Sequence, residues 1–170
     1  EKELNIDHKD MVWHERCIDE STNGIFIPGV TGIAAPYWKS ELGTVKIGLE
    51  NAKNDEIIRA AMESIGFLVH DIIKQMDLKD ALPDMLTASG GGARAPLLQF
   101  IADMLMIAVG HISLKDRTAI GVLQLLYKKN TGHYLSVGAE CDEIFEPRMK
   151  KVTRAKKLKH WQNALAQVGI

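Results

Sequence analysis

The stretch Ser89-Gly90-Gly91-Gly92-Ala93-Arg94-Ala95-Pro96 places three consecutive glycines between a short apolar strand and a helix. Met85 to Ala88 predicts the strand, and Ala95 to Leu105 predicts the helix, with Pro96 suited to its first turn. Glycine lets a backbone approach a ligand closely, and a helix start offers unpaired N–H groups and the positive end of a dipole. The stretch therefore favours a site for phosphate, or for the ribose–phosphate end of a nucleotide.

This glycine run is not one of the two common phosphate-binding motifs. It lacks the GxGxxG spacing of a dinucleotide-binding turn, and it lacks the GxxxxGK[ST] pattern of a P-loop. A plain strand–helix turn without any ligand fits the same spacing and stays open as the alternative at this point.

The rest of the chain alternates between strand-like and helix-like segments. This order predicts an α/β fold with helices on the faces of a sheet. The expected strands are Ile25–Ile27, Thr44–Leu49, Met85–Ala88 and Met106–Ile112. The expected helices are a short stretch around Met11 to Ile18, then Asp55–Met76, Ala95–Leu105, Thr118–Lys129 (ended by Gly132) and Arg148–Val168.

The helix expected at Asp55–Met76 has the strongest periodicity in the chain. Its main apolar line has spacings of three and four, which predicts a face packed on a sheet or on another helix; this line is Ile57, Ala61, Ile65, Leu68, Ile72 and Met76. We therefore expect Ile65 and Ile72 to be core residues. The polar stripe is expected to face solvent and consists of Glu56, Arg59, Glu63, His70 and Lys74. Asn54 is the expected N-cap.

Composition narrows the class of protein. The chain has 170 residues, 46% of them hydrophobic and 25% charged, with a net charge of −1, which suits one folded domain. Near-neutral charge argues against nucleic acid as a partner. Cys17 and Cys141 are isolated, so neither a zinc site nor a disulfide scaffold is expected. No apolar run approaches the roughly 20 residues of a membrane span, and we expect a cytoplasmic protein.

Other conspicuous side chains have structural explanations at this stage. Trp38 is expected to anchor a loop by burying its ring, with an exposed position facing a cleft as the alternative. Four methionines at core-like positions are expected to fill the core: Met62, Met76, Met104 and Met106. The basic run from Arg148 to Lys159 is expected to be a solvated helix face.

Four separated segments resemble the FGGY family of carbohydrate kinases, in the order found in that family. Ser89 to Pro96, with Gln99 and Ala102-Asp103, resembles the nucleotide-binding loop and its helix. Gly32 to Trp38 resembles a stretch typical of glycerol kinases, and Thr118 to Gly121 resembles the start of the family's TALG helix. The C-terminal helix is similar at Phe145-Glu146-Pro147, Trp161 and Ala164. The four matches together span Gly24 to Ala166.

The resemblance implies an actin-like, ribonuclease-H-like ATPase fold with two lobes, of which this chain is the incomplete C-terminal one. Residues 24–170 would form that lobe, and residues 1–23 would lead into it. ATP with Mg²⁺ is the implied cofactor, the metal being held mainly by the nucleotide and the other lobe. The implied nucleotide-binding residues are Gly90, Gly91, Gly92 and Ala95. The implied partners are ATP or ADP and a polyol or sugar, and a homo-oligomer is expected.

The resemblance also implies what this chain does not supply. In the family the catalytic base is an Asp of the N-terminal lobe, and no segment here resembles its motif, so we expect no catalytic residue, no protein metal site and no activity from this chain alone. Ser89 stands where glycerol kinases have Asp, and Arg117 replaces a small hydroxyl residue. A pentulose or another sugar is therefore an alternative substrate to glycerol. There are two alternatives to a kinase lobe. One is a non-catalytic nucleotide- or protein-binding module of the same fold, and the other is an unrelated α/β domain.

Overall fold

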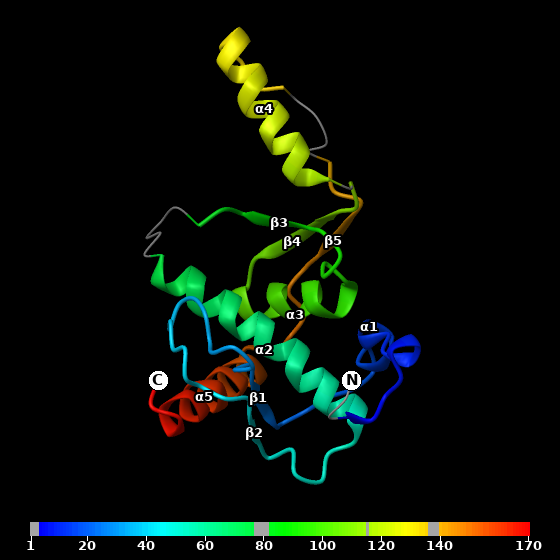
Figure 1. The fold of residues 1–170 in the computed structure, drawn as a ribbon, viewed down its shortest axis with the longest axis vertical. Coiled ribbons are helices and arrows are strands. Elements are labelled where there is room, and N and C mark those ends of the chain that lie inside the picture. Colours follow the sequence, from blue (N-terminus) through cyan, green and yellow to red (C-terminus); the bar gives the residue numbers. More distant parts are fainter. Residues whose placement is uncertain (1–3, 77–81, 115, 136–139) are drawn as a thin grey trace.

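The computed structural model describes residues 4–76, 82–114, 116–135 and 140–170. A 3₁₀ turn at His8–Asp10 precedes the helix α1 (Trp13–Arg16). The remaining elements follow in the order β1 (Ile25–Ile27), β2 (Val45–Ile47), α2 (Asn54–Gln75), β3 (Met85–Ser89), α3 (Ala95–Leu105), β4 (Ala108–Ile112), α4 (Arg117–Thr131), β5 (Glu143–Phe145) and α5 (Lys151–Gln167) (Figure 1). None of the helices in these ranges is both long and apolar enough to span a membrane.

The strands form two small sheets. β1 and β2 pair antiparallel, with Ile25 opposite Ile47. The second sheet has the order β3-β4-β5, in which β3 and β4 are parallel and β4 and β5 are antiparallel. Helix α3 connects the two parallel strands, as a crossover between parallel strands must. The α/β prediction is confirmed, and β5 is a strand that the sequence analysis did not expect.

Helix α3 lies between two apolar cores. Leu97, Phe100 and Met104 join the larger core, which α2, β1 and α5 complete. Leu98 and Ala102 join a smaller core with Val109 of β4 and Phe145 of β5. Because α3 is buried on two sides, its position relative to the sheet is fixed, and so is the glycine turn at its N-terminus.

Helix α2 packs through a different face from the one predicted. Ile65 is 45% exposed, Met76 is also exposed, and Ile72 is only half-buried, so the prediction that Ile65 is a core residue is wrong. The buried face contains Ile58, Met62 and Phe67. It also contains Gly66, where a Cβ would collide with the Phe100 ring, so this position permits the close approach of α2 to α3.

Two carboxylates of α2 are buried, and one of them, Glu63, was predicted to lie on the exposed stripe. Asp71 is 7% exposed and accepts hydrogen bonds at Oδ2 from the Trp161 indole N–H at 2.6 Å and the Tyr37 hydroxyl at 2.7 Å. His70 Nδ1 lies 3.0 Å from Asp71 Oδ1, and the His70 side chain is largely buried, contrary to the prediction that it is exposed. The donors hydrogen-bonded to Asp71 satisfy its charge, which explains why α2 can turn this face inward.

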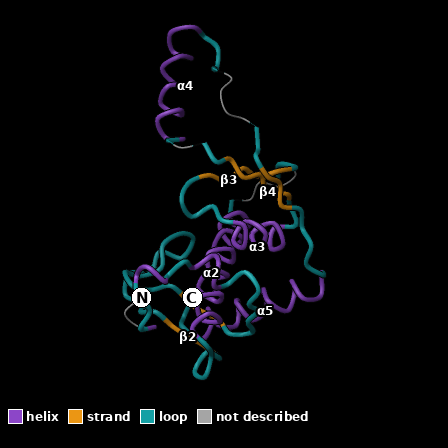
Figure 2. Tube along the Cα trace, turned by 90° about the vertical axis from the view of Figure 1, so that its right-hand side faces the viewer, coloured by secondary structure: helices purple, strands orange, loops and turns teal. Residues whose placement is uncertain are grey.

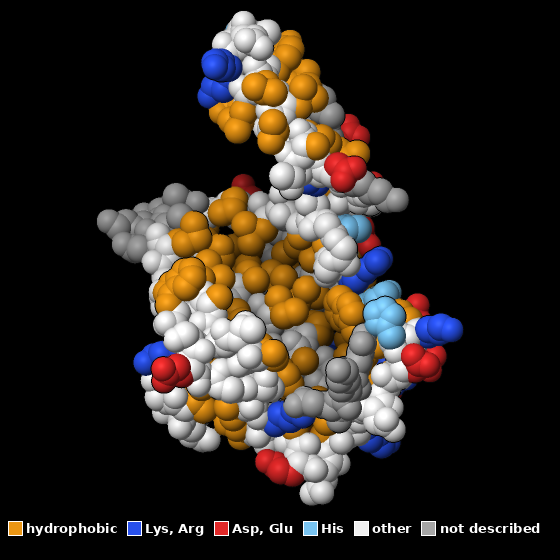
Figure 3. Space-filling model, viewed as in Figure 1, with side chains coloured by type: hydrophobic (Ala, Val, Ile, Leu, Met, Phe, Trp, Pro, Cys, Tyr) orange, Lys and Arg blue, Asp and Glu red, His pale blue; other side chains and the backbone are white. Residues whose placement is uncertain are grey.

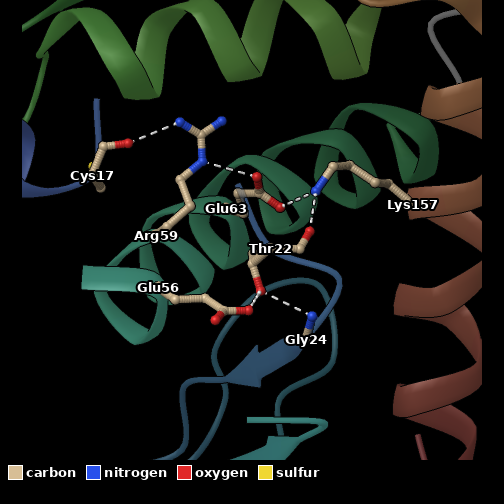
Figure 4. A network of polar contacts seen from close by, with 7 residues as sticks. All are labelled: Cys17, Thr22, Gly24, Glu56, Arg59, Glu63 and Lys157. Atoms are coloured by element: carbon tan, nitrogen blue, oxygen red, sulfur yellow. Dashed lines mark hydrogen bonds and ion pairs between the residues drawn. The ribbon is translucent and has the colours of Figure 1, made fainter. Parts of the chain in front are cut away.

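Glu63 is the second buried carboxylate, and Figure 4 shows its contacts. Its two oxygens accept hydrogen bonds from Arg59 Nε at 2.9 Å and Lys157 Nζ at 2.7 Å. Lys157 also donates to the Thr22 carbonyl, and Arg59 donates to the Cys17 carbonyl. The network therefore joins the segment before β1 to α2 and α5. The basic run on α5 is thus not only a solvated face, since Lys157 points inward.

Several predictions for single residues need correction. Trp38 is 76% exposed at a positive φ of 55°, so its ring does not anchor the loop by burial. Met106 ends α3 in the left-handed conformation and is exposed, so β4 begins later than predicted.

Asn54 is the first residue of α2 rather than its N-cap, and its amide donates to the Leu4 carbonyl. Met62 and Met104 are core residues as predicted, whereas Met76 and Met106 are exposed.

Helix α4 stands apart from the rest of the molecule. Figures 1 and 2 show it projecting from the end of the β3-β4-β5 sheet, and none of its residues is buried. Apolar side chains cover much of the face of this helix that Figure 3 shows. The exposed apolar residues of this helix are Val122, Leu123, Leu125, Leu126 and Tyr127.

Candidate functional site

The carboxyl ends of the two parallel strands meet at one edge of the sheet. Ser89, the last residue of β3, pairs in register with Ile112, the last residue of β4. In the sequence, α3 follows β3 after residues 90–94, and α4 follows β4 from Arg117 onward. Ligands of α/β proteins bind in this position, outside the carboxyl ends of parallel strands.

Only the first residue of the glycine turn has a backbone conformation that strictly requires glycine. Gly90 has a φ of +99°, a conformation that L side chains rarely adopt. Its carbonyl accepts the Ala93 N–H at 3.1 Å, and the Gly92 carbonyl accepts the Arg94 N–H at 2.9 Å. A Cβ added at Gly90, Gly91 or Gly92 would meet no atom within 4 Å. The turn is therefore open on its outer side, where a ligand could approach the backbone.

The turn borders a pocket of about 640 Å³ between the starts of α3 and α4. One wall is the glycine turn, and the other is the segment that ends β4 and begins α4. The lining residues are Ser89, Gly90, Gly91, Ala93, Arg94, His111, Ile112, Ser113, Leu114, Asp116, Arg117 and Thr118. The pocket thus combines backbone N–H groups, two arginines and three hydroxyls, which suits an anionic and partly aromatic ligand.

A side-chain contact fixes the wall formed by β4. Asp142 Oδ2 accepts the Ser113 backbone N–H, and the Asp142 N–H donates to the His111 carbonyl at 2.8 Å. The Ser113 backbone bond lowers the pKa of the exposed Asp142 carboxyl below its usual value. The residue that follows β4 is therefore tied to the residue that precedes β5, at the edge of the pocket.

The predicted site residues fall partly inside this pocket. Gly90 and Gly91 line it, whereas Gly92 and Ala95 are exposed beside it. The glycine run did not indicate the second wall, to which His111, Asp116 and Arg117 belong. Two features of the sequence could have indicated this second wall. The predicted strand to Ile112 ends in polar residues, and a predicted helix follows it, as one follows the strand before the glycines.

The described residues contain no group of three or more His, Cys, Asp or Glu side chains arranged to hold a metal ion. Asp116 is the one carboxylate among the residues that line the pocket. A single carboxylate suits a Mg²⁺ ion that is coordinated mostly by phosphate oxygens and water, as this ion prefers. The pocket is therefore compatible with a metal–nucleotide complex.

Solved structures with the same fold are kinases of carbohydrates and polyols. Plasmodium falciparum glycerol kinase with ADP superimposes with a TM-score of 0.81 at 23% identity, over 99% of this chain and 35% of that protein. Ligand-bound xylulose kinase from Lactobacillus acidophilus gives a TM-score of 0.74 at 20% identity, over 91% and 34% of the two chains. The fold is therefore that of a lobe of the actin-like, ribonuclease-H-like ATPases.

Sequence comparison narrows this class to one family. The C-terminal domain of the FGGY family of carbohydrate kinases matches residues 12–126, and the chain belongs to that family. Glycerol kinase of Caldanaerobacter subterraneus is 32% identical over 154 residues, and that of Thermococcus kodakarensis is 30% identical over 153 residues. Each match covers 86% of this chain and 31% of the relative, so the chain spans about a third of these relatives' length.

Proposed function

We propose that this chain is the nucleotide-binding lobe of an ATP-dependent carbohydrate kinase, with glycerol or a similar polyol as the phosphate acceptor. One observation carries the proposal: the glycine turn lies open at the carboxyl ends of two parallel strands, in a pocket with two helix N-termini and two arginines. The kinship with glycerol kinases supports the choice of acceptor. A pentulose or other sugar is the alternative acceptor, supported by the SGGGAR form of the turn.

In this proposal each wall of the pocket has its own task. The backbone of Gly90 to Gly92 approaches the ribose and phosphates, and Ala95 at the first turn of α3 lies beside the base. Arg94 and Arg117 offset phosphate charge through hydrogen bonds that are stronger than neutral ones. Mg²⁺, when bound with the nucleotide, would neutralise charge on the phosphates, and Asp116 is the residue that could contact it.

Phosphoryl transfer needs more than the binding of the nucleotide. The acceptor oxygen and the γ-phosphate must be held in line, and a base must receive the hydroxyl proton. The family resemblance assigns that base to the N-terminal lobe. We therefore expect no ATP turnover with glycerol from this chain alone, and only weak ADP binding, since one wall of the cleft faces water. A protein-binding module of the same fold is the alternative, favoured by the exposed apolar face of α4.

The test is a titration of the ¹⁵N-labelled chain with ADP up to millimolar concentration, in which the backbone amide chemical shifts are monitored. We expect shifts at Gly90, Gly91 and Thr118. Gly91→Val should fold, because a Cβ there meets no atom, and should abolish these shifts because its side chain occupies the ligand's approach. Gly121→Ala, which also meets open space but lies within α4, is the matched control and should leave them unchanged. Shifts confined to other surfaces, or unaffected by Gly91→Val, would refute the assignment.

A further inference from the structure

A second cavity, with both charged and apolar side chains in its lining, lies between α5 and the segment that precedes β1, away from the glycine turn. It has a volume of about 210 Å³. Helix α5 lines it from one side with Val152 and with four polar side chains at helical spacing: Thr153, Lys156, Lys157 and His160. Positions three, four and seven apart lie on the same face of a helix, so these four side chains form one polar stripe. The opposite wall includes Asn23, Gly24, Glu63 and Phe67.

The inner end of this cavity is already a satisfied network. Lys157 Nζ bonds to Glu63 Oε2 and to the Thr22 carbonyl (Figure 4). Arg59, which lies outside the cavity lining, holds the other Glu63 oxygen. Glu56 lies outside the cavity lining, where it accepts a hydrogen bond from the Thr22 hydroxyl. Lys157 and Glu63 are therefore the fixed floor of the site.

The outer residues, in contrast, have unused donors. In the ranges that the structure describes, Thr153, Lys156 and His160 make no side-chain hydrogen bond or ion pair. Lys157 and Glu63 balance each other in the floor, and Lys156 adds a positive charge that no carboxylate of the lining offsets. A small cavity whose lining has one excess positive charge, and which offers free donors from a lysine, an imidazole and a hydroxyl, favours an oxyanion such as a phosphate group.

A neighbouring cavity extends this site. It has a volume of about 270 Å³ and shares Asn23, Ile25 and His160 with the first. Two amide side chains line its other end, Asn163 and Gln167, together with Ile47 and Ala164. Amide groups both donate and accept hydrogen bonds, as hydroxyl groups require. The pair of cavities therefore offers a compartment with one excess positive charge next to one that is mostly apolar and has two amide side chains at its end.

We propose that these two cavities form a binding site for a small phosphate monoester that carries hydroxyl groups, such as a phosphorylated polyol or sugar. The phosphate group occupies the compartment of Thr153, Lys156 and His160. The hydroxylated carbon chain lies towards Asn163 and Gln167. Bound ligand bridges α5 to the segment before β1, so it strengthens a contact that the Glu63 network already makes. The site is separate from the glycine turn and does not depend on the proposed nucleotide site.

The test is an amide-shift titration of the full chain at constant ionic strength with glycerol 3-phosphate, inorganic phosphate and glycerol as separate probes. We expect glycerol 3-phosphate to shift Asn23, Gly24 and residues 153–160 and to bind more tightly than inorganic phosphate, with glycerol alone giving no shifts. Lys156→Gln should weaken binding about tenfold, the loss expected for one charge-assisted hydrogen bond. Lys159→Gln removes the same charge from an exposed position of α5 outside the cavity and should change nothing.

Three results would overturn the proposal. Absence of shifts at these residues with both phosphate probes would remove the site. Equal weakening by Lys156→Gln and Lys159→Gln would reduce it to general attraction by a basic helix. Equal affinity for inorganic phosphate and glycerol 3-phosphate would contradict the role given to the neighbouring cavity, and hence the monoester. Because no probe contains a nucleotide, failure here leaves the glycine-turn proposal untouched.

Discussion

Asp71 illustrates how single residues hold this lobe together. Its carboxylate joins α2 to Trp161 of α5 and to Tyr37 of the Gly32–Trp38 segment. Burial raises the pKa of Asp71, but hydrogen bonds from His70, Trp161 and Tyr37 outweigh this effect and hold the pKa below its usual value. Burial and the same hydrogen bond raise the pKa of the Tyr37 hydroxyl. The network is therefore built around an ionised carboxylate.

We predict that Asp71→Asn lowers the free energy of unfolding by about 1–3 kcal/mol at neutral pH, the cost of disturbing a buried hydrogen-bonded charge. Because the folded pKa is depressed, this stabilisation is present above the ordinary carboxyl pKa near 3.8 and is lost as the pH falls through the lower folded value. The difference in the free energy of unfolding between wild type and variant should therefore narrow below that pH. Denaturant titrations between pH 7 and pH 3 measure this difference. Asp19→Asn, at an exposed position, is the control. A gap independent of pH would contradict the ionised network.

At the scale of elements, the contact between α2 and α3 determines where the glycine turn lies. Gly66 of α2 faces the Phe100 ring, and Phe67 stacks on Trp161 with ring centroids 5.1 Å apart. Helix propensity alone would favour Ala over Gly at an interior position by about 1 kcal/mol. Here the added methyl group has no space, so packing and propensity act in opposite directions.

We predict that Gly66→Ala destabilises the fold by about 1–3 kcal/mol, because the Phe100 ring must shift within a closely packed core. Gly121→Ala makes the same change within α4, where the new methyl group meets no atom. That variant should be neutral or slightly stabilising. Chemical denaturation of both variants compares the two sites directly. A neutral Gly66→Ala variant would mean that α2 and α3 are further apart than described.

The elements that the sequence predicted well are those with local signals. Pro96 and the glycines mark the start of α3, and Gly132, at a φ of +78°, ends α4 as expected. The buried face of α2 could not be predicted in this way, because apolar residues lie on both sides of the helix. Its orientation depends on partners for Glu63 and Asp71 that are 94 and 90 residues away in the chain. Half of the candidate site was missed for the same reason, since β4 meets the glycine turn only through parallel pairing.

At the scale of the whole molecule, two apolar surfaces remain uncovered. Helix α4 carries exposed leucines, including Leu125 at 65% exposure. A groove of about 610 Å³ on the body is lined mainly by apolar side chains, among them Trp13, Phe26 and Ile65. Exposed apolar surface of several hundred Å² is uncommon on proteins that remain monomeric.

We predict that the chain self-associates, and that Leu125→Lys on α4 reduces the association without loss of folding, because the side chain is exposed. Val152→Lys on α5 replaces another exposed apolar residue, at 83% exposure, and serves as the matched control. Light scattering over a concentration series, with circular dichroism to monitor folding, measures both. A wild-type chain that is monomeric at all concentrations would contradict this prediction, as would equal effects of the two variants.

The proposed nucleotide site lies between the glycine turn and the start of α4. A crystal structure of the chain grown with millimolar ADP and Mg²⁺ tests it most directly. We expect ADP in the pocket lined by Gly90, Gly91, Arg94 and Arg117, with its ribose and phosphates against the glycine turn. ADP bound at another surface, with this pocket occupied only by solvent, would contradict it.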